Sequence, residues 1–148
     1  MTITVANLEN VPEIIALCYK NFAEIGQHLP KPDTLKGVAS MSEFVSNGLV
    51  FVKKEENGKI VGILVLTPFN FWWSETTVLH TATLYVLPEY RDKNTFNELI
   101  EEAQSYADHV GTRLYFDKLI DSEALDVLIR RKGFTKTGDI YVYGNESD

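Results

Sequence analysis

Apolar residues recur with the period of a helix over the stretch that follows residue 94. They occupy one helical face, at Phe96, Leu99, Ile100, Ala103, Ala107 and Val110. An apolar run that ends at Val86 and a short charged loop at residues 88–94 precede them. Thr95 and Glu98 have the spacing of a capping box, which places the helix start near residue 95. The pattern therefore predicts a strand, a loop and a helix in succession.

The rest of the pattern predicts an α+β domain. Strands are expected at residues 2–5, 49–53, 59–67, 76–86, 113–118, 134–136 and 140–143, and further helices at 11–25, 34–46 and 122–131. Asn57-Gly58 predicts a hairpin, and Pro68 is expected to end the strand that follows it. Residues 1–148 are expected to form a single domain.

The longest predicted strand, residues 76–86, alternates along its length. One face is expected to carry Val78, His80, Ala82, Leu84 and Val86, and the other Leu79, Thr81, Thr83 and Tyr85. His80 and Leu84 are thus expected on the same face of a central strand.

Charge and composition exclude several classes of function. The 148 residues carry a formal net charge of −7 without a run of basic residues, so a nucleic-acid partner is not expected. The acidic balance favours a cationic substrate such as an amine. The single cysteine, Cys18, excludes an internal disulfide and suits a reducing compartment. The chain begins without a basic, apolar leader, and no apolar run approaches the roughly 20 residues of a membrane helix. We expect a cytoplasmic protein.

Several kinds of enzyme are excluded by their missing motifs. No Cys/His cluster has the spacing of a zinc site, so no metal is expected. Neither a GxSxG motif nor a phosphate-binding P-loop is present.

The loop before residue 95 has the features of an anion site. Arg91 and Lys93 supply positive charge, and the free N–H groups of a helix start lie beside them. Asn94 tolerates left-handed backbone geometry. Phe96 shares the register of the core residues and is expected to point into the core. The sequence predicts a phosphate site here.

Two segments carry a resemblance to a known family. VLPEYRDKNTFNELIEEAQSYA resembles the acyl-CoA-binding segment of the GNAT superfamily of N-acetyltransferases, V-x-P-E-Y-R-G-x-G-x-G/A, with matches at Val86, Pro88, Glu89, Tyr90 and Arg91. Asp92, Asn94 and Phe96 stand where the family has glycines, so the loop is divergent. ALDVLIRRKGFTKTGDIYVY resembles a second family segment, with Gly133-Phe134 matched and Ile129 in place of a tyrosine.

The resemblance implies a mixed central sheet of about six or seven strands flanked by about four helices. It also implies transfer of an acetyl group from acetyl-CoA to an amine of a small molecule or protein. The residues implied to bind acetyl-CoA are Leu84, Tyr85, Val86, Arg91, Asp92, Lys93, Asn94, Thr95, Phe96 and Ser122. His80 is the candidate base, since histidine titrates at about pH 6.5. Glu75 is a second candidate, and Tyr141 is a candidate proton donor.

The aromatic run Phe69–Trp73 leaves more than one use open. Three interpretations are open for these rings: packing within the fold, an interface with a subunit or partner, or a lid over a substrate pocket. Phe71, Trp72 and Trp73, with His28 in the loop at residues 27–33, are candidates for an acceptor or partner surface, and a homodimer is one such partner. The alternative function is a catalytically inactive GNAT-fold protein that contacts a protein partner through the aromatic patch.

Overall fold

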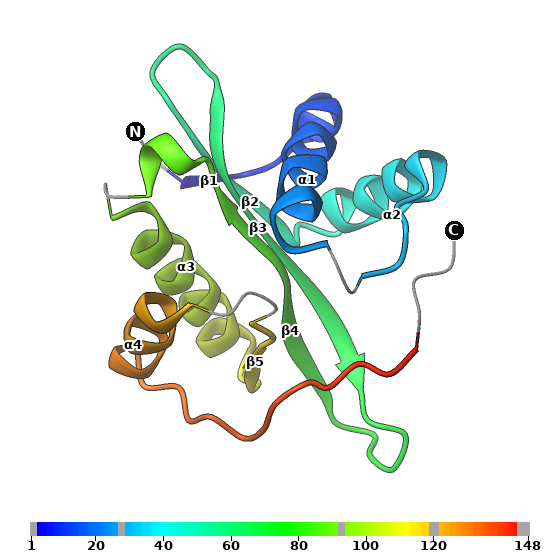
Figure 1. Cartoon of the computed structure of the whole chain (residues 1–148), viewed down its shortest axis with the longest axis vertical. Helices are drawn as coiled ribbons and strands as arrows, with labels where there is room; N and C mark the ends of the chain where they lie inside the picture. Colours follow the sequence, from blue (N-terminus) through cyan, green and yellow to red (C-terminus); the bar gives the residue numbers. More distant parts are fainter. Residues whose placement is uncertain (1–2, 27–28, 92–93, 119–121, 145–148) are drawn as a thin grey trace.

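The computed structural model describes residues 3–26, 29–91, 94–118 and 122–144, which form one mixed sheet in the order β1–β2–β3–β4–β5 (Figure 1). The strands are β1 Ile3–Val5, β2 Val50–Lys54, β3 Ile60–Asn70, β4 Thr77–Val86 and β5 Leu114–Phe116. The helices are α1 Val11–Ile25, α2 Thr34–Ser46, α3 Thr95–Val110 and α4 Glu123–Arg131, with short 3-10 turns at Leu8–Asn10 and Pro88–Tyr90. The α+β class is confirmed, but the described residues give five strands rather than six or seven.

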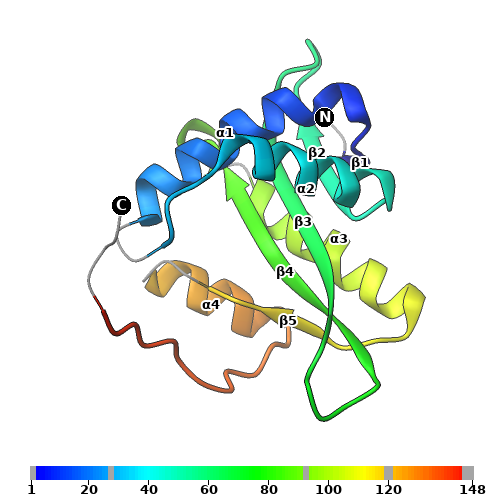
Figure 2. The same ribbon diagram turned by 90° about the vertical axis from the view of Figure 1, so that its right-hand side faces the viewer.

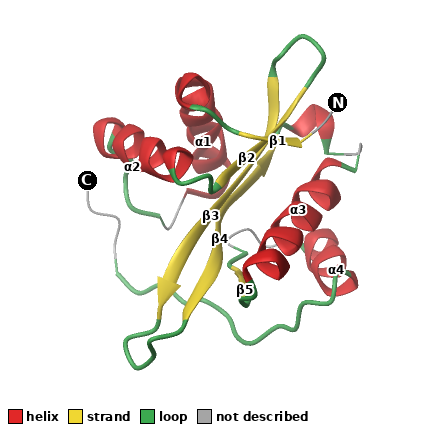
Figure 3. Cartoon of the chain, turned by 180° about the vertical axis from the view of Figure 1, so that it is seen from behind, coloured by secondary structure: helices red, strands yellow, loops and turns green. Residues whose placement is uncertain are grey.

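Helices cover both faces of the sheet. Helices α1 and α2 lie on one face, called here the α1 face, and α3 and α4 lie on the other, the α3 face (Figures 1 and 3). Helix α1 buries Ile14 and Leu17 in the first core, whereas α3 buries Leu99 and Ala103 in the second. Each such buried Leu or Ile stabilises the fold by about 1.5–3 kcal/mol relative to an exposed one.

The predicted start of α3 is confirmed, but its predicted capping box is wrong. The residue at the N-cap is Asn94, and its side chain makes no capping hydrogen bond. Thr95 is buried inside the first turn, and Glu98 forms an ion pair with the buried Lys53 of β2 instead of reaching back to the helix start. The carboxylate therefore fixes α3 against the sheet.

Strand β3 runs through Pro68 to Asn70, so the predicted stop at Pro68 is wrong. Leu66 donates its N–H to Leu49 O (2.9 Å), on the side of the strand that faces β2. The nitrogen of Pro68, two residues further along, points to the same side. Pairing between β3 and β2 ends at Val65, so no strand lies opposite Pro68 on that side. Proline is tolerated on such a free edge because no ladder hydrogen bond is lost there.

Strand β4 contains one extra residue relative to β3. Thr81 lies opposite Leu66, and Thr83 lies opposite Val65, so two steps along β4 match one step along β3. Ala82 is therefore the extra residue of a β-bulge. Val65 belongs to the core under α1 and Leu66 to the core under α3.

The bulge reverses which face the side chains of β4 occupy. Directly opposed residues share a face, so Thr83 faces α1 and Thr81 faces α3. Alternation from these positions puts His80 on the α1 face and Leu84 on the α3 face. The prediction that His80 and Leu84 share a face is therefore wrong, because strict alternation does not survive a bulge.

The two predicted C-terminal strands, residues 134–136 and 140–143, are absent from the described structure. The chain leaves α4 through Gly133 and runs extended below the helix (Figure 2). Ile140–Tyr143 are exposed, with Tyr143 at 94%. Alternating apolar residues form a strand only against a partner edge, and this segment pairs with none in the part of the chain that the structure describes.

Two findings concern membrane spans and metal ligands. None of the described helices is long and apolar enough to cross a membrane. Within the same residues, no group of three or more His, Cys, Asp or Glu side chains is placed to hold a metal ion.

Candidate active site

A gap opens between β4 and β5, the strand at one edge of the sheet. The two strands pair in parallel only over Leu79–Thr81 and Leu114–Phe116, whereas β4 continues to Val86. From Ala82 onward, this edge of β4 has no strand beside it among the described residues. The main chain of β4 is therefore open to a ligand along about half of the strand.

The main-chain groups that point into this gap belong to alternate residues. Leu87 donates its N–H to Val61 O of β3 (2.9 Å). Because antiparallel pairing alternates, Tyr85 also directs its main chain to β3, whereas Leu84 and Val86 direct theirs to the open edge. Of the three residues predicted to pair with a ligand, Leu84 and Val86 are placed to do so, and Tyr85 is not.

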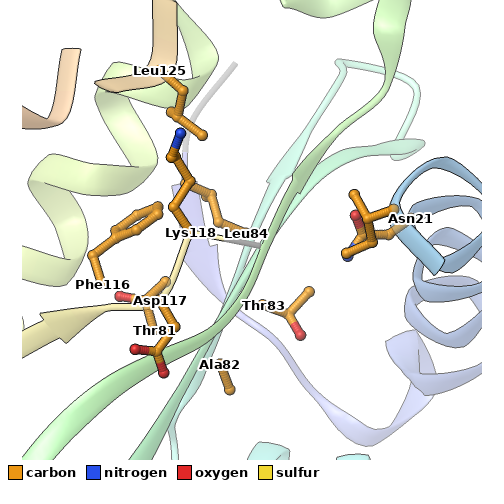
Figure 4. Close-up of a pocket in the computed structure, with 10 residues that line it drawn as sticks. Asn21, Thr81, Ala82, Thr83, Leu84, Phe116, Asp117, Lys118 and Leu125 are labelled. Atoms are coloured by element: carbon orange, nitrogen blue, oxygen red, sulfur yellow. The ribbon is translucent and has the colours of Figure 1, made fainter. Parts of the chain in front are cut away.

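A cavity of about 60 Å³ occupies the gap (Figure 4). Thr83 lies on the side of α1, near Asn21, whereas Phe116 and Lys118 lie toward α3 and α4. Thr81 also lines the cavity, and its buried hydroxyl has no hydrogen-bond partner among the described residues. An unsatisfied hydroxyl there can bind a polar ligand atom, since leaving it unpaired is unfavourable.

His80 and Asp117 form a hydrogen-bonded pair at the end of the gap where β4 still pairs with β5. His80 Nδ1 lies 2.7 Å from Asp117 Oδ2. A proton on Nδ1 donates to the carboxylate, which leaves Nε2 as a lone-pair acceptor. Nε2 is buried and unpartnered within the described structure. Asp117 was missed from the sequence, although its alternation with Tyr115 on β5 could have indicated that it shares a face with that ring.

The predicted aromatic candidates lie at the tip of the β3–β4 hairpin. Phe71 stacks on Trp73 with ring centres 4.8 Å apart, and Trp72 packs edge-on against Trp73 at 5.5 Å. Trp72 is 92% exposed and Trp73 is 65% exposed. Glu75, the second candidate base, is exposed in the same loop, and its main-chain carbonyl accepts from the Asn70 side chain.

The N-terminus of α3 lies at the Val86 end of the open edge (Figure 1). Asn94 adopts a left-handed conformation, with φ of 65°, which is the geometry expected of a glycine in this loop. The first bond of the helix runs from Glu98 N–H to Asn94 O, so the N–H groups of residues 95–97 come before it. Phe96 packs against the core on the α3 face, as predicted.

Arg91 is held by protein groups rather than directed to open space. Its Nε donates to Val86 O, and its Nη2 lies 2.9 Å from both carboxylate oxygens of Glu24 on α1. Tyr85 donates its hydroxyl to Glu24 as well (2.8 Å). The sequence had suggested that Arg91 contributes free positive charge to the loop, whereas Glu24 compensates that charge.

This cluster shifts two pKa values. Partial burial alone would raise the pKa of Glu24, but the hydrogen bonds and charge of Arg91 and Tyr85 together hold it below its ordinary value. Burial, followed by the hydrogen bond to Glu24 and its negative charge, raises the pKa of Tyr85 to about 12. The Tyr85 phenol therefore stays protonated at neutral pH.

The remaining candidates fall elsewhere. Ser122 caps α4, since its hydroxyl accepts from Leu125 N–H (3.2 Å), and its carbonyl accepts from Lys118 Nζ (3.3 Å). Tyr141 is 90% exposed in the C-terminal segment. Three candidates, His28, Asp92 and Lys93, lie outside the described residues.

Comparisons with known proteins agree with this architecture. Residues 11–134 match the model of the acetyltransferase (GNAT) family. None of the curated proteins matches the chain.

Many solved structures share the fold at low sequence identity. An aminoglycoside antibiotic 6'-N-acetyltransferase from Acinetobacter haemolyticus is 18% identical, with a TM-score of 0.71 and 100% of each chain covered. A ribosomal-protein-alanine N-acetyltransferase from Brucella melitensis is 15% identical, with a TM-score of 0.67 and 97% and 99% covered. A predicted acetyltransferase from Clostridium acetobutylicum, solved with acetyl-CoA, is 12% identical, with a TM-score of 0.76 and 97% and 95% covered.

Proposed function

This chain belongs to the acetyltransferase (GNAT) family, and from that premise we propose that it transfers an acetyl group from acetyl-CoA to an amine of a small molecule or a protein. The observation that carries the proposal is the order of features along β4. The His80–Asp117 pair comes first, the open edge at Leu84 and Val86 follows, and the N-terminus of α3 comes last. A proton acceptor, a strand edge and an anion site are the three parts that this reaction needs.

The residues present fit acetyl-CoA. The main-chain groups of Leu84 and the N–H of Val86 would pair with the amide groups of the pantetheine arm, since Val86 O already accepts from Arg91 Nε. The N–H groups of residues 95–97 would hold the pyrophosphate at the positive end of α3. Asn94 adopts the left-handed conformation that a glycine would adopt at this position. Asparagine in place of glycine therefore retains the backbone geometry of this residue. Bound acetyl-CoA supplies an acetyl thioester, an activated carbonyl group that an amine attacks.

The side chains of the gap supply the proton chemistry. His80 Nε2 takes a proton from the acceptor amine, which must be uncharged to attack. Asp117 holds the imidazole in the required tautomer and stabilises its protonated form. The Thr81 hydroxyl, unpaired in the cavity, would serve as a hydrogen-bond donor to the carbonyl oxygen of the bound group. The proton that His80 takes from the amine would then be available for the thiolate that leaves, and Tyr141, which is 90% exposed, is not assigned a role.

Two further parts of the proposal concern location and partners. We place the protein in the cytoplasm, since its single cysteine, Cys18, is buried and unpaired. Its acceptor is a cation at neutral pH, in keeping with the net charge of −7. The exposed Trp72 and Trp73 are compatible with a contact surface, but exposure of these rings is no argument for lost catalysis.

A thermal-shift titration with acetyl-CoA, followed by a thiol-release assay with amines, tests the proposal. Acetyl-CoA at 100 times its Kd should stabilise the protein by about 2.7 kcal/mol, which raises Tm by roughly 5–10 °C. Absence of a shift at millimolar acetyl-CoA would overturn the proposal. Binding without release of CoA for any amine would support the inactive alternative.

A further inference from the structure

A continuous row of rings runs from His80 to the tip of the β3–β4 hairpin. We call it the aromatic ledge, and its members are Phe69, Phe71, Trp72, Trp73, His80 and Tyr115. His80 stacks on Tyr115, with centres 5.4 Å apart and planes 24° apart. Tyr115 contacts Phe71 edge-on at 5.7 Å, and Phe71 stacks on Trp73 at 4.8 Å. The imidazole of the proposed base is thus the first ring of the ledge.

The ledge is exposed toward the tip and buried toward the base. Trp72 is 92% exposed and Trp73 is 65% exposed, whereas His80 is half-buried. The hairpin that carries these rings projects beyond the helices (Figure 2). A surface with several aromatic rings in contact is rare on a protein that has nothing to bind there.

The charges along the ledge are few and lie at its ends. Residues 69–74 contain no charged side chain. Asp117 lies at the inner end, hydrogen-bonded to His80, and Glu75 lies in the loop at the outer end. A matching ligand places one cationic group near His80 and Asp117 and an uncharged flat body over the rings.

We infer that the ledge binds the acceptor, and that the acceptor is a primary amine carried by an aromatic or similarly flat apolar group. This inference rests on the proposed function, because it takes His80 as the base. The flat body of such an amine lies over the exposed ring of Trp73, and its ammonium group lies toward Asp117, the carboxylate that is hydrogen-bonded to His80. A stacked aromatic pair strengthens binding by roughly two- to tenfold beyond the effect of its buried area. A polycationic, hydroxyl-rich acceptor would find few carboxylates along this surface.

The first test compares amines on the intact protein. We expect kcat/KM for 2-phenylethylamine to exceed that for n-butylamine by roughly two- to tenfold, the range that a stacked ring provides. An aminoglycoside serves as the polycationic comparison. The ring should also quench tryptophan fluorescence on binding, a readout that does not depend on turnover.

The second test changes the ledge. Trp73→Ala should remove the preference for 2-phenylethylamine over n-butylamine, and Trp73→Phe should retain most of it. Tyr143→Ala, which removes an exposed ring outside the ledge, is the matched control. If Trp73→Ala fails to fold, Trp73→Phe and the fluorescence titration still test whether the ledge binds the acceptor.

The outcomes separate the two proposals. Acetylation of n-butylamine or the aminoglycoside at least as fast as 2-phenylethylamine would overturn the ledge assignment and leave the proposed function standing. A change from dimer to monomer in Trp73→Ala, with kinetics unchanged, would show that the ledge is a subunit interface and would also overturn the assignment. Failure of acetyl-CoA to bind would overturn the proposed function, and the assignment would fall with it.

Discussion

Both carboxylate oxygens of Glu24 lie 2.9 Å from the same nitrogen of Arg91. This contact ties the last turn of α1 to the loop that leads from β4 into α3. Arg91 extends the connection by donating from Nε to Val86 O, and Tyr85 adds a hydrogen bond to Glu24. We call these contacts of Glu24 with Arg91 and Tyr85 the Glu24 brace. Because Val86 lies on the open edge of β4, the brace fixes the strand beside the proposed pantetheine site, and Arg91 occupies the carbonyl group of Val86.

Removing the charge of Glu24 should weaken this brace. We expect Glu24→Gln to lower the free energy of unfolding by about 0.5–1 kcal/mol, because both side chains are roughly a third exposed and solvent screens the pair. Urea denaturation at pH 7 measures the change. Glu43→Gln, at an exposed glutamate of α2, is the matched control, and an equal effect in both variants would contradict the brace.

The same pair predicts a dependence of stability on pH. The pKa of Glu24 is lowered in the folded protein, so its contribution is fully present above the unfolded value of about 4.3 and is lost as pH falls through the lower folded value. The difference in unfolding free energy between the wild type and Glu24→Gln should therefore be constant from pH 7 to pH 5 and shrink toward pH 3. A difference that persists undiminished at pH 3 would rule out this linkage.

Asn94 should respond to substitution as a left-handed residue. Its side chain makes no capping bond, so the backbone conformation dominates the outcome. We expect Asn94→Gly to be neutral or slightly stabilising and Asn94→Ala to destabilise by about 1 kcal/mol. At Asn47, where φ is −89°, the order should reverse, with Ala more stable than Gly. Thermal unfolding of the four variants measures whether glycine or alanine is more stable at each site. The same order of stability at both sites would contradict a left-handed conformation at Asn94.

The sequence predicted the helices well because their periodicity is local. The bounds expected for α2 agree with the structure, and Ser122 caps α4 as expected. Phe96 also points into the core, which its register with Leu99 had indicated. These features depend on residues a few positions apart, which one sequence displays directly.

The features that the sequence could not supply depend on distant partners. The bulge at Ala82 is invisible in an alternating pattern, yet it moves His80 to the face opposite Leu84. Glu24 and Arg91 are 67 positions apart, so Arg91 was taken as a free cation. The C-terminal residues have strand-like alternation, but alternation does not provide an edge to pair with.

Gly62 should be intolerant of a larger side chain. A Cβ built there would lie 3.1 Å from both Leu99 Cδ1 and Thr95 Cγ2, where α3 approaches the sheet. We expect Gly62→Ala to destabilise by about 1–3 kcal/mol. Thr95→Ser removes the clashing methyl and should recover part of the loss in the double variant, as a double-mutant cycle measures.

A second glycine provides the control for this prediction. Gly37 lies in α2, and a Cβ there would meet only Ile15 Cδ1, at an ordinary 3.9 Å. Gly37→Ala should therefore stabilise the protein by about 0.5–1 kcal/mol, the usual helical preference for alanine. Equal destabilisation at both glycines would show that the close approach at Gly62 is not the cause.

The His80–Asp117 pair predicts how substitutions change the rate of acetyl transfer. His80→Gln should lower kcat/KM by about 10²–10⁴ and leave the affinity for acetyl-CoA unchanged, because the base acts on the amine. Asp117→Asn keeps an oxygen near Nδ1 but removes the charge that stabilises protonated His80. We expect Asp117→Asn to lower kcat/KM as well. His109→Gln, at the end of α3, is the matched control. An unchanged kcat/KM in His80→Gln would assign the proton transfer to another group, and Glu75→Gln would then be the variant to test.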